Sequence, residues 1–184
     1  MAVPLTFAAT SPLLAWRDPI YIIAGFAGVL AMVLLLLQPL LAGKRLSGIY
    51  PKHARTLHQM IGGLIVGAVL VHLIGLWITS PPDVVDALLF RSPTGFSVWG
   101  VIAMWALLGS ALIAIFRKRL RVRPKVWLRI HTALGCVIVT GTILHSLLIQ
   151  GTMEPISKIL LSAILAFVTI FVVLRQNAGS RQNP

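Results

Sequence analysis

The sequence predicts an all-α integral membrane protein that folds as a five-helix transmembrane bundle. Its 184 residues are 58% hydrophobic and only 11% charged, whereas ordinary soluble domains are about 25% charged. The apolar residues also come in long runs, and residues 21–43 carry no charge at all. An α-helix needs about 20 apolar residues to cross the hydrocarbon core of a bilayer, so these runs are long enough to span a membrane.

The first apolar run predicts a retained helix over residues 20–42. It is too long for the apolar region of a cleavable signal peptide, which has about 7–15 residues. The preceding segment, residues 1–19, is too short to span and is expected outside the membrane. Within the run, Pro39 predicts a kink, because proline lacks the N–H that an interior helical position donates.

Four further apolar runs predict the rest of the bundle. The second helix, residues 55–79, is expected to end before Pro81 and Pro82, since the residue before a proline is biased away from the helical conformation. The remaining helices are expected over residues 95–116, 126–150 and 155–174. One bundle over residues 20–174 therefore accounts for the chain, followed by a polar cytoplasmic tail, residues 175–184.

Basic residues are concentrated on one face of the predicted bundle. The connection between the first two helices, the connection over residues 117–129 and the tail hold 13 lysines and arginines. The opposite face has three, together with all four acidic residues. Such an excess marks cytoplasmic loops. The N-terminus is therefore predicted outside and the C-terminus in the cytoplasm, in a multi-pass protein of the inner (plasma) membrane. This topology explains the net charge of +12 without a nucleic-acid partner.

Four of the five histidines form two pairs with the same spacing. His58 and His72 lie in the second predicted helix, and His131 and His145 lie in the fourth. Fourteen residues are nearly four helical turns, so each pair shares one helix face over a rise of about 21 Å. The two helices are separated by one helix and run parallel. Spacing and topology therefore predict two bis-histidine sites, His58 with His131 near the inner face and His72 with His145 near the outer face.

Two imidazoles at each depth favour haem over zinc. A structural or catalytic zinc ion needs three or four protein ligands, often including thiolate or carboxylate. The single cysteine, Cys136, excludes haem attachment through a CxxCH motif. We therefore predict two six-coordinate b-type haems, whose iron is bound by the four histidines. The alternative for an intramembrane histidine is a structural hydrogen bond to a neighbouring helix.

Other residues are assigned to the same sites by position. Gly62 and Gly135, each four residues after an inner histidine, are expected to leave space for the macrocycle. Arg55 and Arg129 precede the inner histidines by one turn or less and are expected to pair with haem propionates. The fifth histidine, His53, is expected to be solvated in a basic loop.

The chain resembles the ferric reductase-like transmembrane domain, a family that includes ferric reductases, NADPH oxidases and the haem subunit of the bacterial methionine sulfoxide reductase system. The resemblance covers about residues 55–174. It is carried by "ARTLHQMIGGLIVGAVLVHLIG", "SPTGFSVWGVIAMWALLGSALIAIFRKRL" and "VWLRIHTALGCVIVTGTILHSLL". It implies that His58 and His131 hold an inner haem and that His72 and His145 hold an outer one. It also implies that electrons pass from a cytoplasmic reductant to an acceptor on the far side.

The sequence departs from the family pattern in two ways. The family domain commonly has six helices, and this chain is expected to lack the first. Many members continue into flavin and nicotinamide domains, and no G-x-G-x-x-G motif is present here. No flavin is therefore expected to bind in this chain, which is predicted to be an electron-transfer subunit rather than a complete reductase.

The donor and the acceptor stay open at this stage. The expected donor is a separate cytoplasmic flavoprotein reductase or a membrane quinol, and the expected acceptor is ferric iron, a periplasmic redox protein or oxygen. One alternative is a cytochrome b subunit of a quinone-linked dehydrogenase. Another is a haem-free membrane scaffold whose histidines only pack helices.

Overall fold

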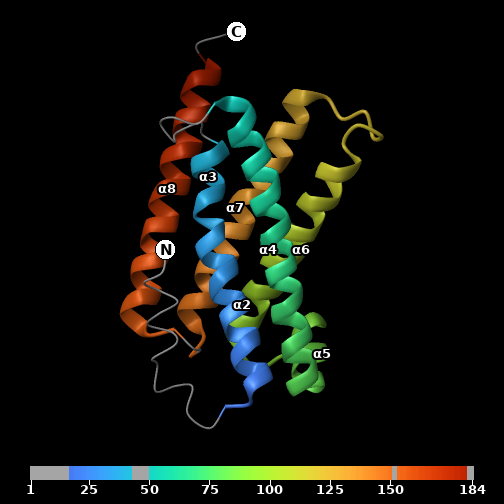
Figure 1. The fold of residues 1–184 in the computed structure, drawn as a ribbon, viewed down its shortest axis with the longest axis vertical. Helices are drawn as coiled ribbons and strands as arrows, with labels where there is room; N and C mark the ends of the chain where they lie inside the picture. Colours follow the sequence, from blue (N-terminus) through green and yellow to red (C-terminus); the bar gives the residue numbers. More distant parts are fainter. Residues whose placement is uncertain (1–16, 43–49, 151–152, 182–184) are drawn as a thin grey trace.

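The computed structural model describes residues 17–42, 50–150 and 153–181, and these residues form seven helices and the turns between them (Figure 1). Five stretches of helix are long and apolar enough to cross a membrane, as predicted. Many large apolar side chains point outward, for example Ile115, Ile156 and Phe167, each more than 70% exposed. Such a surface suits hydrocarbon rather than water. The helices are α2 Pro19–Leu35, α3 Leu37–Ala42, α4 Pro51–Thr79, α5 Pro81–Leu88, α6 Gly95–Phe116, α7 Pro124–Leu148 and α8 Pro155–Arg181.

Proline begins most of these helices. Pro19, Pro51, Pro81 and Pro124 each lie in the first turn of a helix, where the missing N–H would have no intrahelical partner in any case. Ahead of Pro19, the carboxylate of Asp18 accepts a hydrogen bond from the backbone N–H of Ile20 at 2.7 Å, as an N-cap residue does. Local sequence thus fixes where these helices start.

The first predicted helix is interrupted. It consists of α2 and α3, with a turn at Leu36 between them. Pro39 explains the break, because it has no N–H to donate to the carbonyl of Leu35, and its ring crowds that carbonyl. The two pieces still form one membrane span, Pro19–Ala42.

Several helix ends differ from the approximate positions expected from the sequence. The second helix starts at Pro51 rather than at residue 55, so His53 lies in its first turn and not in a loop, although its side chain is exposed. The fourth helix runs from Pro124 to Leu148 rather than over residues 126–150. The last helix continues to Arg181 instead of ending at residue 174. The short helix α5 was not predicted at all.

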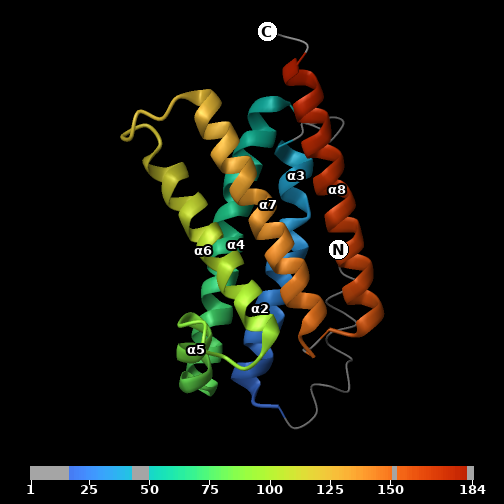
Figure 2. The same ribbon diagram turned by 180° about the vertical axis from the view of Figure 1, so that it is seen from behind.

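The helices pack as two antiparallel hairpins, α2 with α4 and α6 with α7. Figures 1 and 2 show α8 beside α7 on the side away from α6. Small residues allow close approach within each hairpin, as in many membrane bundles. A Cβ on Gly75 would lie 2.7 Å from the Cβ of Ala24, and one on Gly141 would lie 2.8 Å from the carbonyl oxygen of Trp99. By contrast, the backbones of α4 and α7 make few contacts with each other.

The charges gather at the two ends of the bundle. The start of α4, the α6–α7 connection and the end of α8 lie at one end (Figure 1), and they contain the basic residues from 52 to 55 and from 117 to 129 as well as Arg175. Asp18, Asp83, Asp86 and Glu154 lie at the other end. Lys44 and Arg45 fall outside the described residues.

Candidate functional site

The four predicted histidines meet in two pairs. The rings of His58 on α4 and His131 on α7 have centroids 5.8 Å apart, and those of His72 and His145 are 6.5 Å apart on the same two helices. The ring planes are close to perpendicular in both pairs, at 69° and 83°. The structure thus places one pair near each end of the bundle.

Main-chain carbonyls orient both rings of the pair formed by His72 and His145, called here the outer pair. His72 donates from Nδ1 to the carbonyl oxygen of Ala24 on α2 at 2.7 Å, and His145 donates from Nδ1 to that of Phe96 on α6 at 2.9 Å. A carbonyl can only accept, so both rings carry their proton on Nδ1. The lone pair of each ring is therefore on Nε2.

A glycine one turn later makes each of these carbonyls accessible. A helical side chain covers the surface of the turn that precedes it, so the side chain four residues after a carbonyl would shield that carbonyl. Here that residue is a glycine in both cases: Gly28 follows Ala24, and Gly100 follows Phe96. A Cβ there would lie 3.1 Å from Nδ1 of His72 and 2.7 Å from Nδ1 of His145, respectively. The two glycines therefore let the imidazoles reach the backbone.

The pair formed by His58 and His131, called here the inner pair, is held differently. Nδ1 of His131 is 2.9 Å from the hydroxyl of Ser110 on α6, and a hydroxyl can donate or accept. Nδ1 of His58 is buried and has no hydrogen-bond partner among the described residues. On the neighbouring helix α3, Gln38 donates from its amide to the main-chain carbonyl of His58 at 3.2 Å instead.

An aromatic and cationic stack also contacts the inner pair. The ring of Trp127 stacks on His131 with centroids 4.8 Å apart and an interplanar angle of 22°, and the Arg117 guanidinium lies 5.5 Å from the Trp127 ring centroid. At the outer pair, Phe96 meets His145 edge-on at 5.7 Å. Each imidazole of α7 is therefore fixed by a ring as well as by a hydrogen bond.

Comparison with protein families gave one match, to the ferric reductase like transmembrane component, over residues 15–142. This is more than half of the chain. The chain belongs to this family. Neither the comparison with curated proteins nor that with solved structures gave a significant match.

Membership of the ferric reductase-like family indicates transmembrane electron transfer and a membrane setting with redox partners. The matched segment begins at residue 15, whereas the resemblance was expected to begin at about residue 55, and it therefore includes α2. It contains His58, His72 and His131 and ends three residues before His145. The family is known for haem binding, so each histidine pair can be compared with what a haem iron requires.

The separation of the rings in each histidine pair can be compared with the separation that a shared metal would need. A metal–imidazole bond of about 2 Å puts two rings on opposite sides of a metal with centroids about 6 Å apart, close to the 5.8 and 6.5 Å found. A ligating histidine usually donates its other N–H to a backbone carbonyl or side chain, as His72 and His145 do. Among the described residues, no three histidine, cysteine or acidic side chains gather to bind a metal ion.

The other predicted site residues stay untested. Arg55 and Arg129 are exposed at the basic end, near the inner pair. A Cβ on Gly135 would meet nothing within 4 Å, which is compatible with the predicted clearance but also true of several other glycines. A Cβ on Gly62 would lie 3.6 Å from the Gln38 amide nitrogen, so this glycine also leaves room for Gln38.

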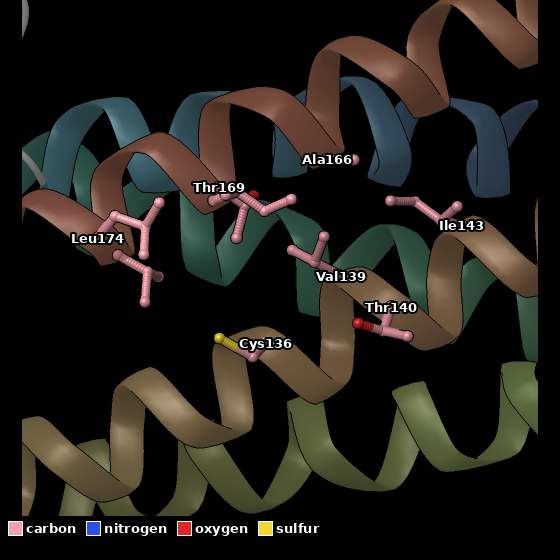
Figure 3. Close-up of a pocket in the computed structure, with 9 residues that line it drawn as sticks. Cys136, Val139, Thr140, Ile143, Ala166, Thr169 and Leu174 are labelled. Atoms are coloured by element: carbon pink, nitrogen blue, oxygen red, sulfur yellow. The ribbon is translucent and has the colours of Figure 1, made fainter.

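A separate apolar groove of about 300 Å³ lies between α7 and α8. Figure 3 shows Cys136, Val139 and Ile143 from α7 on one side and Ala166 and Thr169 from α8 on the other. None of the four paired histidines lines it. The hydroxyl of Thr169 is buried and has no partner among the described residues, and Thr140 adds a second hydroxyl to the lining of the groove.

Sequence reasoning missed the residues that orient the histidines. Ser110, Gly28 and Gly100 belong to the helices before α4 and α7, and each helix was treated only as a membrane span. The only feature that the two positions share in the sequence is a glycine four residues after the accepting carbonyl, Gly28 after Ala24 and Gly100 after Phe96.

Proposed function

We propose that this chain carries electrons across the membrane through two b-type haems. His58 and His131 would bind the inner haem, and His72 and His145 the outer one. The observation that supports the proposal is the meeting of four histidines as two facing pairs, one toward each end of a bundle from a ferric reductase-like family. The rise along α4 between its two histidines is about 21 Å.

In this proposal the chain supplies ligands, anchors and a dry environment. Bound haem iron would supply one-electron redox chemistry. With two histidines held for each iron, the chain would favour outer-sphere electron transfer over oxygen binding. Arg55 and Arg129 would pair with the propionates of the inner haem, and Gly62 and Gly135 would leave space beside its ring. The outward-facing apolar side chains would keep water away from both sites.

The direction of transfer follows from the distribution of charge. The basic end would face the cytoplasm of a cell whose inner membrane holds the protein, with the N-terminus outside. A separate flavoprotein reductase with an acidic surface would dock on residues 117–129 and deliver electrons. Ferric iron or a periplasmic redox protein would accept them at the outer end.

The decisive experiment is a pyridine haemochrome assay with protein quantification. We expect two haems per chain. His72→Ala should remove about half of the haem, because only the outer site loses a ligand, and His58→Ala should do the same at the inner site. Retention of both haems by His72→Ala would show that the pairing is wrong. A purified protein without an α-band in its reduced spectrum would leave the haem-free scaffold as the better explanation.

A second candidate function is a cytochrome b subunit that takes electrons from a membrane quinol. The observation that favours it is the apolar groove between α7 and α8, where the free Thr169 hydroxyl could hydrogen-bond a quinone carbonyl. Reduction of the haems by a soluble quinol in the purified protein would support this function. Loss of that reduction in Thr169→Val, with haem content unchanged, would locate the quinol in the groove.

A further inference from the structure

The two histidine pairs differ in the kind of group that accepts the Nδ1 proton. Both rings of the outer pair donate to main-chain carbonyls, at 2.7 and 2.9 Å. In the inner pair, His131 has the Ser110 hydroxyl at 2.9 Å, and His58 has no partner among the described residues. The four histidines thus include two with a strong main-chain acceptor and one with a weaker hydroxyl acceptor. The fourth, His58, has no Nδ1 acceptor at hydrogen-bond geometry among the described residues, although its ring interacts with the Gln38 backbone.

This difference has a direct electronic consequence for a bound metal. A strong acceptor on Nδ1–H raises the basicity of the ring, so Nε2 donates more electron density and stabilises the oxidised metal. Hydrogen bonding around the ligands is one of the means by which a protein sets a haem potential. The Arg117 cation, which lies over the Trp127 ring stacked on His131, disfavours oxidised iron at the inner site as well.

We propose that the bundle is built to hold its two haems at different potentials, with the inner one higher, and that Ser110 is the positioning residue that tunes the inner site. The inner-to-outer step is then uphill between the haems, and the overall difference in potential between donor and acceptor drives it. This inference rests on the proposed function. Ser110 acts through His131, since it holds the ring by Nδ1 and leaves Nε2 to the metal. Its side chain is only 6% exposed, so water does not replace its hydroxyl when that group is lost.

A spectroelectrochemical titration of the purified haem-loaded protein tests both parts of the proposal. We expect two one-electron steps, and in His72→Ala only the more positive step should remain. In Ser110→Ala the inner step should move to a more positive potential and the outer step should stay in place. A tenfold change in the ratio of oxidised to reduced iron corresponds to about 59 mV for one electron, and a shift of roughly this size is expected.

Ser110→Thr keeps a hydroxyl and should leave the inner step near its original potential. The matched control is Ser162→Ala, which removes another buried serine hydroxyl, one that faces Ser146 rather than a histidine. It should move neither step. The inference is overturned if His72→Ala retains the more negative step, or if Ser110→Ala and Ser162→Ala titrate alike. Absence of haem from the wild-type chain would instead overturn the proposed function.

Discussion

Among the described residues, three main-chain carbonyls inside the transmembrane helices accept a hydrogen bond from a side chain of another helix. Each is followed one turn later by a glycine. The pairs of carbonyl and glycine are Ala24 with Gly28, Phe96 with Gly100 and His58 with Gly62. In each case the glycine has no side chain to cover the carbonyl of the preceding turn. The carbonyl therefore stays open to a side chain from a neighbouring helix.

Gly100→Ala should disrupt the outer site. The added Cβ would lie 2.7 Å from Nδ1 and 2.9 Å from Cε1 of His145, so the ring must leave the Phe96 carbonyl. Overpacking of this kind costs about 1–3 kcal/mol. We expect a lower midpoint of thermal unfolding in detergent, followed by circular dichroism, and a haem content close to one per chain.

Gly109→Ala is the matched control on the same helix, because a Cβ there would meet nothing within 4 Å. It should keep both haems and the original midpoint, or gain about 0.5–1 kcal/mol from the lower chain entropy of alanine. Equal behaviour of the two variants would show that Gly100 is not needed for the His145 contact.

At this scale the sequence predicted which histidines meet but not what holds them. The spacing of 14 residues is visible in the sequence because helix geometry turns it into a shared face. The acceptors on Ala24 and Phe96 are main-chain atoms that every residue has, so residue type could not reveal them. Ser110 was one of two serines in its helix, and nothing in the sequence distinguished it from Ser97.

At the scale of single elements, α7 contains two glycines with opposite surroundings. Gly141 is buried against α6, where a Cβ would lie 2.8 Å from the Trp99 carbonyl oxygen and 3.0 Å from the Cβ of Ala103. Gly135 has nothing within 4 Å. One glycine therefore serves packing within the hairpin, and the other is free for the predicted role beside the inner haem.

Gly141→Ala should lower the stability of the protein with and without haem, by about 1–3 kcal/mol, because backbone atoms cannot move aside as a side chain can. Gly135→Ala should leave the haem-free protein as stable as before and reduce haem binding at the inner site. Thermal unfolding of both forms, with haem quantification, separates the two effects. Normal haem content in Gly135→Ala would refute the clearance role of that glycine.

The centres of the helices were predicted well and their ends less well. Uninterrupted apolar runs identify a span, whereas the position of an end depends on capping and on the residues beyond the helix. The start of α5 had a signal in the sequence, since Ser80 precedes Pro81 and its hydroxyl donates to the Asp83 carboxylate at 2.5 Å. The two prolines were interpreted only as the end of a helix, although proline also begins one.

At the scale of the whole molecule, the basic and acidic ends predict one orientation in the membrane. In a Cys136→Ser background, Lys118→Cys should react with a membrane-impermeant maleimide only when the cytoplasmic face is exposed. Asp86→Cys should react in intact cells. The Cys136→Ser protein alone should stay unlabelled, and the reverse pattern would contradict the orientation predicted from the charges.

The fold class, the five spans and the family were predictable because the bilayer imposes length and apolarity on every span. The way in which the spans pair was not, since lipid-facing and helix-facing apolar residues look alike in sequence. The groove beside Cys136 could likewise not be predicted from the sequence, because it depends on how α8 packs against α7.

Every ring of the two pairs that has an Nδ1 partner finds it within its own hairpin: His72 on α2, and His131 and His145 on α6. Each hairpin can therefore prepare its ligands during synthesis before the other exists. Each proposed haem nevertheless needs one ligand from each hairpin, so neither half captures it alone. Apolar side chains of the two halves also share one core, in which Val29 and Ile65 lie with Ala106 and Ile138. Two fragments divided between α5 and α6 should then associate in the membrane without haem, and more tightly when haem is supplied, because each haem would take one ligand from each half.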